Sequence, residues 1–239
     1  MIQTLTYGRA AAAAMLGGVG GMLLLGGLVE GPLENAPLWL QLLAGLLPLH
    51  ICAFAAALAV VAADAGEWRL SPRLLRQLGF GASQAGRLSS PGFIAMSAAG
   101  ACLSTALLSL ACAALLEQLG VPVTGNPLIR AVIEEGTVRS WLALAFVGVI
   151  VAPPVEEFLF REVLNGAFGG VGAGSARRAA VLSAAAFAVI HGIPAQMPAL
   201  FALALFLQWL RRRSGSLRAG TAVHAVYNFL AILVLALIA

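Results

Sequence analysis

The sequence has 239 residues, of which 61% are hydrophobic and only 10% are charged, with a formal net charge of +4. Soluble domains carry about 25% charged residues, so this composition excludes a water-soluble globule and predicts an integral membrane protein. All fourteen basic residues are arginines, and a compositional bias of the source explains that better than nucleic-acid binding does; we expect no nucleic-acid partner.

Seven apolar segments follow one another along the chain. A helix needs about 20 apolar residues to cross a bilayer. The segments are 10–29, 37–63, 93–116, 140–168, 179–193, 197–210 and 217–238. The fifth and sixth are short and are expected to form a tight helical hairpin. We therefore predict an all-α fold, a polytopic bundle of about seven transmembrane helices (six to eight), in one integral-membrane domain over residues 1–239.

The first two segments carry few polar groups. The glycines of GGVGGMLLLGG in the first segment offer a GxxxG face for close packing against another helix. His50, in the second segment, has no partner motif, and we predict that it is structural or interfacial.

A pair of prolines interrupts the fourth segment. Proline inside a helix removes a hydrogen bond and clashes with the preceding turn. We therefore expect a kink or break at Pro153 and Pro154, with Glu156 and Glu157 in the first turn that follows.

The arginines predict the orientation. With seven crossings, eleven of them fall on one side of the membrane, and the positive-inside rule places that side in the cytoplasm. These are Arg9, Arg69, Arg73, Arg76, Arg87, Arg177, Arg178, Arg211, Arg212, Arg213 and Arg218. Only Arg130 and Arg139 fall on the other side. The N-terminus is then cytoplasmic and the C-terminus external.

Three of the segments carry polar side chains that are expensive to place in lipid, at a cost of about 2.5–3.5 kcal/mol for a charged side chain at a helix centre. The residues are Glu156, Glu157 and Arg161 in PPVEEFLFR, His191 in FAVIH, and His224 and Asn228 in HAVYN. Helical rise places all three groups at a similar depth. We predict that they form one internal site, and that Glu157 and Arg161, four residues apart, pair on one helical face.

This set of groups fits amide hydrolysis without a covalent intermediate. A carboxylate and an imidazole can hold and deprotonate water, and an imidazole and an amide can donate hydrogen bonds to an oxyanion. Ser183, the nearest hydroxyl, lacks the context of a nucleophile. Glu156, His191 and His224 could alternatively bind zinc, although no HExxH motif is present; no cofactor is our first expectation.

The same polar groups also allow interpretations that involve no hydrolysis. Glu157 and Arg161 could be a structural ion pair, and His191 or Asn228 could form hydrogen bonds between helices. The cavity could belong to a non-catalytic scaffold or immunity protein that binds a peptide or membrane partner. A transporter is a further alternative, since buried carboxylates also mark proton paths, but the sequence contains no repeat.

Together the three motifs resemble the CAAX-processing intramembrane glutamate protease family, also called CPBP or ABI, which includes the Ras-converting CAAX endopeptidases. Its pattern of EExxxR, FxxxH and HxxxN reads here as Glu156 to Arg161, Phe187 to His191 and His224 to Asn228. The resemblance covers roughly residues 138–232.

The resemblance implies an intramembrane endopeptidase. Glu156 would activate water with help from His191, His224 and Asn228 would form the oxyanion hole, and Glu157 and Arg161 would support them. Eukaryotic relatives cut after a prenylated cysteine, and bacterial relatives are associated with bacteriocin or pheromone processing, self-immunity or regulation of membrane proteins. The lysine-free, alanine-rich composition favours a bacterial cytoplasmic membrane, with a peptide or membrane-protein substrate.

Overall fold

A computed structural model of the chain describes residues 2–29, 31, 33–66, 71–81, 86–169 and 174–239, and all its regular structure there is helical. Helices occupy all seven predicted segments. They are α1 (Ile2–Val29), α2 (Leu38–Ala65), α4 (Pro91–Gln118), the continuous stretch Val138–Phe168, α9 (Ser175–Ile190), α10 (Met197–Ser214) and α11 (Leu217–Ile238). Short elements join them: α3 (Pro72–Gln77), η1 (Gly86–Ser89), α5 (Pro127–Glu135) and η4 (Pro194–Gln196). The predicted polytopic helical bundle is confirmed.

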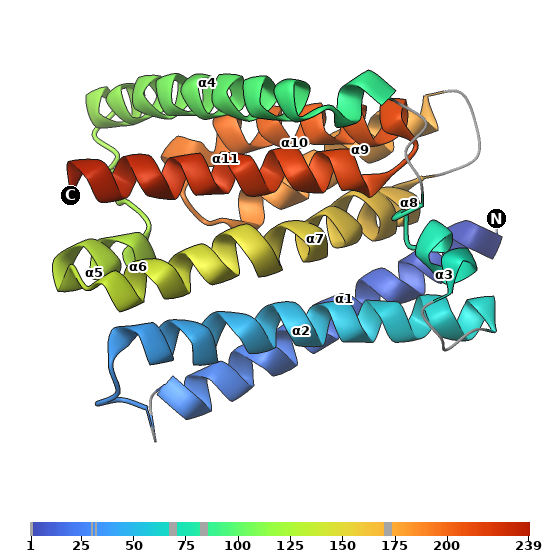
Figure 1. Ribbon diagram of the computed structural model, residues 1–239, viewed down its shortest axis with the longest axis horizontal. Coiled ribbons are helices and arrows are strands. Elements are labelled where there is room, and N and C mark those ends of the chain that lie inside the picture. The colour runs from blue at the N-terminus through green and yellow to red at the C-terminus, as the bar shows by residue number, and fades with distance from the viewer. Residues whose placement is uncertain (1, 30, 32, 67–70, 82–85, 170–173) are drawn as a thin grey trace.

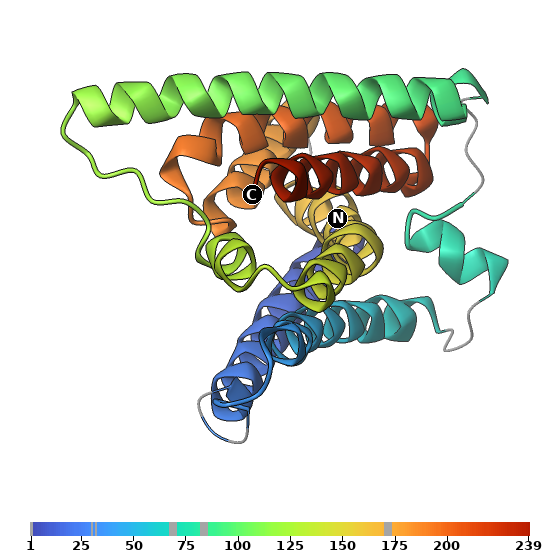
Figure 2. The same cartoon turned by 60° about the vertical axis from the view of Figure 1, so that its left-hand side comes forward.

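Four long helices lie alongside one another in Figure 1: α4, α11, the stretch that contains α7 (Ala152–Glu156), and α2. Helix α11 lies between α4 and α7, and α7 lies between α11 and α2. Helices α1 and α2 form a hairpin on one side of the bundle, while α10 packs below α4 and α9 packs against α10 (Figure 2). The N-terminal end of α1 and the C-terminal end of α11 lie at opposite ends of the bundle (Figure 1).

Many large apolar side chains are exposed on the described helices. Within the described part of the chain, four helices are long and apolar enough to cross a membrane: α2, α4, Val138–Phe168 and α11. Helix α4 leaves Met96, Leu103 and Leu110 largely exposed. The predicted hairpin of short helices is formed by α9, with 16 residues, and α10, with 18.

Local sequence explains where several helices begin. The hydroxyl of Ser90 accepts a hydrogen bond from the N–H of Phe93, and Pro91 occupies the first turn of α4. Asn126 caps α5 in the same way, with Pro127 next in sequence. A capping side chain satisfies an N–H that has no partner inside the helix, and proline lacks the N–H that would need one. Both helices therefore start where the sequence specifies.

The two prolines distort the fourth long helix without ending it. The chain remains helical over 31 residues, Val138–Phe168. It runs from α6 (Val138–Ala145) through a π-helical segment, η2 (Phe146–Val151), to α7, and then through a second, η3 (Glu157–Leu164), to α8 (Asn165–Phe168). In a π-turn each N–H donates to the fifth preceding carbonyl, as Ala152 does to Val147. The glutamates therefore lie at the junction of α7 and η3, inside a continuous helix, and not at the start of a second one.

Glycines bring α1 against α2, as the GxxxG spacing predicts. A Cβ atom added at Gly17 would lie 2.5 Å from the carbonyl oxygen of Cys52, and one at Gly21 would lie 2.7 Å from that of Pro48. Only glycine allows the two backbones to approach so closely. This contact holds the part of α2 between Pro48 and Cys52 in place.

Hydrogen bonds gather the arginine-rich segments at one end of the bundle. Glu162 of η3 accepts a bond from Tyr7 of α1 (3.1 Å) and pairs with Arg211 of α10 (2.7 Å). The start of α11 is tied to the segment after α3, because the N–H of Leu217 donates to Gly79 and Arg218 donates to Phe80. Arg69, also used to predict the orientation, lies outside the described residues.

Candidate active site

Glu156 and Glu157 are adjacent in sequence but lie in different environments. Successive helical residues are turned by about 100°, so the two carboxylates leave the helix in different directions. The Glu157 side chain is completely buried, whereas 19% of the Glu156 side chain is exposed. The structure thus separates one carboxylate that is enclosed from one that solvent or a ligand can reach.

Glu157 is held by charged and polar partners from two helices. Its Oε1 lies 3.4 Å from Nη2 of Arg161, the predicted i,i+4 pair, and 3.2 Å from Nδ1 of His224 on α11. The guanidinium of Arg161 also lies over the ring of Phe187, 4.8 Å from its centre. A buried carboxylate needs such compensation, because burial removes its hydration. Glu157 is therefore a fixed anchor for the imidazole of His224.

Glu156 lies between two imidazoles. Its Oε2 is 3.6 Å from Nε2 of His224, and its Oε1 is 3.6 Å from Nε2 of His50 on α2. His191, at the end of α9, is close enough to interact with it electrostatically. Helices α2 and α11 thus direct histidines towards one partly exposed carboxylate, and His191 lies nearby at the end of α9.

The hydrogen bonds of the three histidines define where their protons lie. Nδ1 of His50 is 2.8 Å from the carbonyl of Leu46, and Nδ1 of His191 is 2.7 Å from that of Phe187. A carbonyl only accepts, so each Nδ1 carries the proton. Nδ1 of His224 likewise donates to Glu157. In a neutral ring Nε2 then carries a lone pair and no proton. The Nε2 atoms of His50 and His224 can therefore interact favourably with the Glu156 carboxylate only through a shared proton or a water molecule.

Asn228 is tied to the distorted helix. Its Nδ2 donates to the carbonyl of Gly148, at 2.7 Å. In the π-register of η2 that carbonyl would accept from the fifth following residue, which is Pro153 and has no N–H. The Asn228 amide supplies the missing donor and keeps a second N–H free for another acceptor.

The structure brings four of the predicted site residues into contact and places His191 at the exposed edge of that cluster. Glu156, Glu157, Arg161 and His224 form one connected cluster. His191 is exposed, and its ring lies against that of Phe187 with the ring centres 4.6 Å apart and the ring planes tilted by 51°. His224 contacts both glutamates, so it links the predicted water-activating and supporting pairs, and it lies four residues before Asn228 on α11.

His50 is the residue of this cluster that sequence reasoning missed. The absence of a surrounding motif predicts a structural or interfacial role, yet the imidazole faces Glu156. A signal is present in the sequence: His50 is a polar residue within an apolar segment, the same observation that identifies His191 and His224. What the sequence does not contain is which face of α2 meets α7.

Two alternative chemistries can be compared with the geometry. Among the described residues, no group of three or more His, Cys, Asp or Glu side chains is arranged to hold a metal ion. Ser183 is fully buried, and its hydroxyl donates to the carbonyl of Phe160. The serine is therefore part of the packing between α9 and η3.

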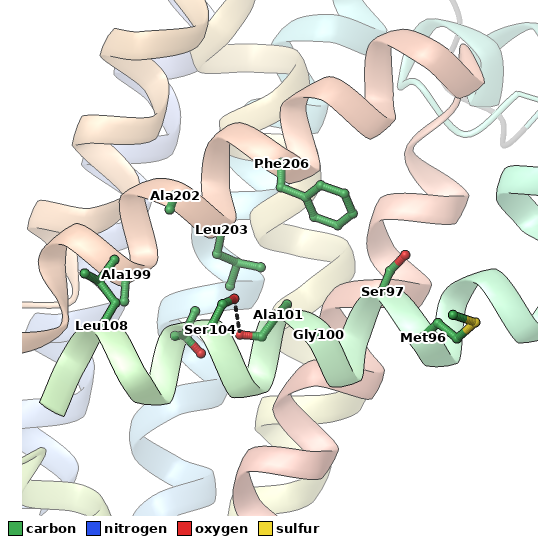
Figure 3. Close-up of a pocket in the computed structure, with 11 residues that line it drawn as sticks. Met96, Ser97, Gly100, Ala101, Ser104, Leu108, Ala199, Ala202, Leu203 and Phe206 are labelled. Atoms are coloured by element: carbon green, nitrogen blue, oxygen red, sulfur yellow. Dashed lines mark hydrogen bonds between the residues drawn. The ribbon is translucent and has the colours of Figure 1, made fainter. Parts of the chain in front are cut away.

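A separate groove of about 340 Å³ runs between α4 and α10. Small residues of both helices line it, among them Gly100, Ala199 and Ala202, and Phe206 lies at one side (Figure 3). The hydroxyl of Ser104 in its wall donates to the carbonyl of Ala101, at 3.1 Å. None of the predicted site residues lines this groove.

Fold and site together define an integral membrane protein, a helical bundle with a carboxylate and imidazole cluster between its helices. Residues 138–230 match the model of the type II CAAX prenyl endopeptidase Rce1-like family, a family of proteases. The match confirms the resemblance to the CAAX-processing proteases and spans the motifs from Glu156 to Asn228, while His50 lies outside it. No curated protein and no solved structure matches the chain.

Proposed function

We propose that this protein is an intramembrane endopeptidase that hydrolyses a peptide bond with water activated by Glu156. The observation that carries the proposal is the contrast between the two glutamates. Glu157 is enclosed by Arg161 and His224, whereas Glu156 is partly exposed and faces imidazole nitrogens on both sides. A base must reach water and must have neighbours that can share the proton it takes, and of these two glutamates Glu156 is the one that meets both conditions.

In the proposed reaction the Glu156 carboxylate takes a proton from water while the water oxygen attacks the carbonyl carbon. His191, at the exposed edge, helps to position the water. The carbonyl oxygen becomes an oxyanion, which the free N–H of Asn228 and a protonated His224 stabilise. The C–N bond then breaks, and the leaving nitrogen takes the proton from Glu156. Glu157 and Arg161 orient His224.

The substrate that we propose is a peptide or a membrane protein that reaches the site from the bilayer. The site lies within the membrane-spanning helices, so a membrane-associated segment has the shortest route to it. We propose a bacterial cytoplasmic membrane as the location, with the N-terminus in the cytoplasm, on the charge bias of the loops. The proposed mechanism needs no cofactor.

Replacement of Glu156 by glutamine tests the proposal. Glutamine keeps the size of the side chain but cannot accept the proton, so cleavage should fall by about 100-fold or more. Membrane and secreted peptides of cells that produce the wild type, Glu156→Gln or Glu134→Gln would be compared by mass spectrometry. Glu134 is a matched control because it is an exposed carboxylate on α5, outside the site.

The outcomes separate the alternatives. Peptides that form with the wild type and Glu134→Gln, but not with equally abundant Glu156→Gln protein, support the proposal. Unchanged cleavage with Glu156→Gln rejects it. A biological phenotype that survives Glu156→Gln favours a non-catalytic scaffold or immunity protein. Stoichiometric zinc that a chelator removes together with activity favours a metalloprotease built on the same residues.

A further inference from the structure

His50 has an arrangement that packing alone does not require. Its side chain is 13% exposed and lies within α2, where a polar ring needs a hydrogen-bond partner. The carbonyl of Leu46, one turn earlier, already satisfies Nδ1 at 2.8 Å. The second nitrogen nevertheless faces Oε1 of Glu156 across the helix interface, at 3.6 Å.

The backbone around His50 is held firmly against its neighbour. Gly17 and Gly21 of α1 pack directly on the carbonyls of Cys52 and Pro48, which flank the histidine. The close packing of α1 against α2 therefore fixes the part of α2 that carries the imidazole, and α2 in turn contacts α7, which carries Glu156.

The geometry constrains the protons between the two groups. Because Nδ1 of His50 carries a proton, Nε2 of the neutral ring is an acceptor, and the ionised Glu156 carboxylate is also an acceptor. Two acceptors face each other favourably only when one proton lies between them. The separation of 3.6 Å exceeds the 2.7–3.2 Å of a formed hydrogen bond, so the contact would shorten when that proton arrives.

We propose that His50 is a positioning residue for Glu156 and shares the proton that Glu156 takes from water. This inference rests on the proposed hydrolysis. The O–H bond of water breaks, the oxygen joins the carbonyl carbon, and the proton lies between Oε1 and Nε2 of His50 while the intermediate exists. When the C–N bond breaks, the leaving nitrogen takes that proton, and the carboxylate and neutral His50 are restored.

His50 and His224 then have different tasks on the two oxygens of one carboxylate. His224 on α11 faces Oε2 and is itself fixed by Glu157, while His50 on α2 faces Oε1. His191, the residue that follows α9, also lies near Glu156. Contacts on both oxygens fix the rotation of the carboxylate, so the oxygen that takes the proton from water keeps one direction.

Activity measurements test the proposal on the peptide that the comparison of Glu156 variants identifies. We expect His50→Phe to lower kcat by about 100-fold with little change in KM, since the lost step is proton transfer. His50→Gln can donate a hydrogen bond to Oε1 but cannot hold the proton, so it should recover part of the activity. Ile51→Phe is the matched control, because Ile51 is the next residue on α2 and is 56% exposed.

A second measurement needs no substrate. The chain has three histidines, so protein labelled with ¹⁵N only in histidine gives three assignable sets of ring signals by NMR. We expect all three Nδ1 atoms to be protonated, and we expect Glu156→Gln to move the Nε2 signal of His50. Ile51→Phe should leave that signal in place. Identical His50 signals in the wild type and in Glu156→Gln would overturn the proposal.

The two proposals fail in different ways. If Glu156→Gln retains full cleavage, the proposed function is wrong. If Glu156→Gln is inactive while His50→Phe keeps the wild-type kcat, only the role of His50 is wrong. If His50→Phe and His50→Gln lose activity equally and both unfold at lower temperature, with no change in the His50 signals on Glu156→Gln, then His50 is merely structural.

Discussion

At the scale of single residues, partners decide what identical side chains can do. Glu156 and Glu157 have the same carboxylate group. Arg161 and His224 enclose Glu157, whereas Glu156 faces imidazoles and is partly exposed. Asn228 also depends on its partner, because its amide donates a hydrogen bond to the carbonyl of Gly148, which Pro153 leaves without a backbone donor. The oxyanion role that the motif implies for Asn228 thus rests on its second N–H.

The bond between Asn228 and Gly148 gives a prediction about stability. Asn228→Ala should destabilise the protein by about 1–3 kcal/mol, because it leaves a carbonyl inside the bundle without a donor. Pro153→Ala restores a backbone N–H, so Asn228→Ala should be less harmful in that background. A double-mutant cycle measured by unfolding in detergent would show a coupling of about 0.5–3 kcal/mol. Strictly additive effects of the two changes would contradict this explanation of Asn228.

At the scale of elements, helix packing and helix distortion place the site. The π-turns η2 and η3 keep Val138–Phe168 continuous while Pro153 and Pro154 pass through it, and this sets the directions of both glutamates. Glycines on α1 then position α2, which delivers His50 from outside the segment that matches the protease family. A helix without any motif therefore contributes to the candidate site through its packing.

Glycine substitutions on α1 test that contribution. Gly21→Ala should destabilise the hairpin by about 1–3 kcal/mol, because the new Cβ would lie within 3 Å of backbone atoms of Pro48 and Leu49. Gly20→Ala is the control: nothing lies within 4 Å of its Cβ position, and alanine favours helix by about 1 kcal/mol. Thermal unfolding in detergent measures both. Equal stability of the two variants would show that the close approach contributes nothing.

At the scale of the whole molecule, the arrangement of the helices gathers charge at one end. Glu162 joins α1, η3 and α10 there, through Tyr7 and Arg211. The N-terminal end of α1 and the C-terminal end of α11 lie at opposite ends of the bundle (Figure 1). We propose that the arginine-rich end faces the cytoplasm, as the positive-inside rule predicts.

Single cysteines test this orientation. The three natural cysteines are free and would be replaced first. Gly86→Cys lies at the arginine-rich end and Gly125→Cys precedes α5, and a Cβ meets nothing within 4 Å at either position. A membrane-impermeant maleimide should label Gly125→Cys in intact cells and Gly86→Cys only after permeabilisation. The reverse pattern would invert the orientation.

The sequence by itself determined the class of fold, the seven helical segments and the motif residues, since hydrophobic length and the cost of polar groups in lipid are local properties. It also predicted the pairing of Glu157 with Arg161, because that contact lies within one turn of helix. Tertiary structure alone decided that His50 faces Glu156, that His224 links both glutamates, and that Asn228 serves the carbonyl of Gly148. These contacts join helices far apart in the chain, and they depend on which helical faces meet, which spacing along one helix cannot specify.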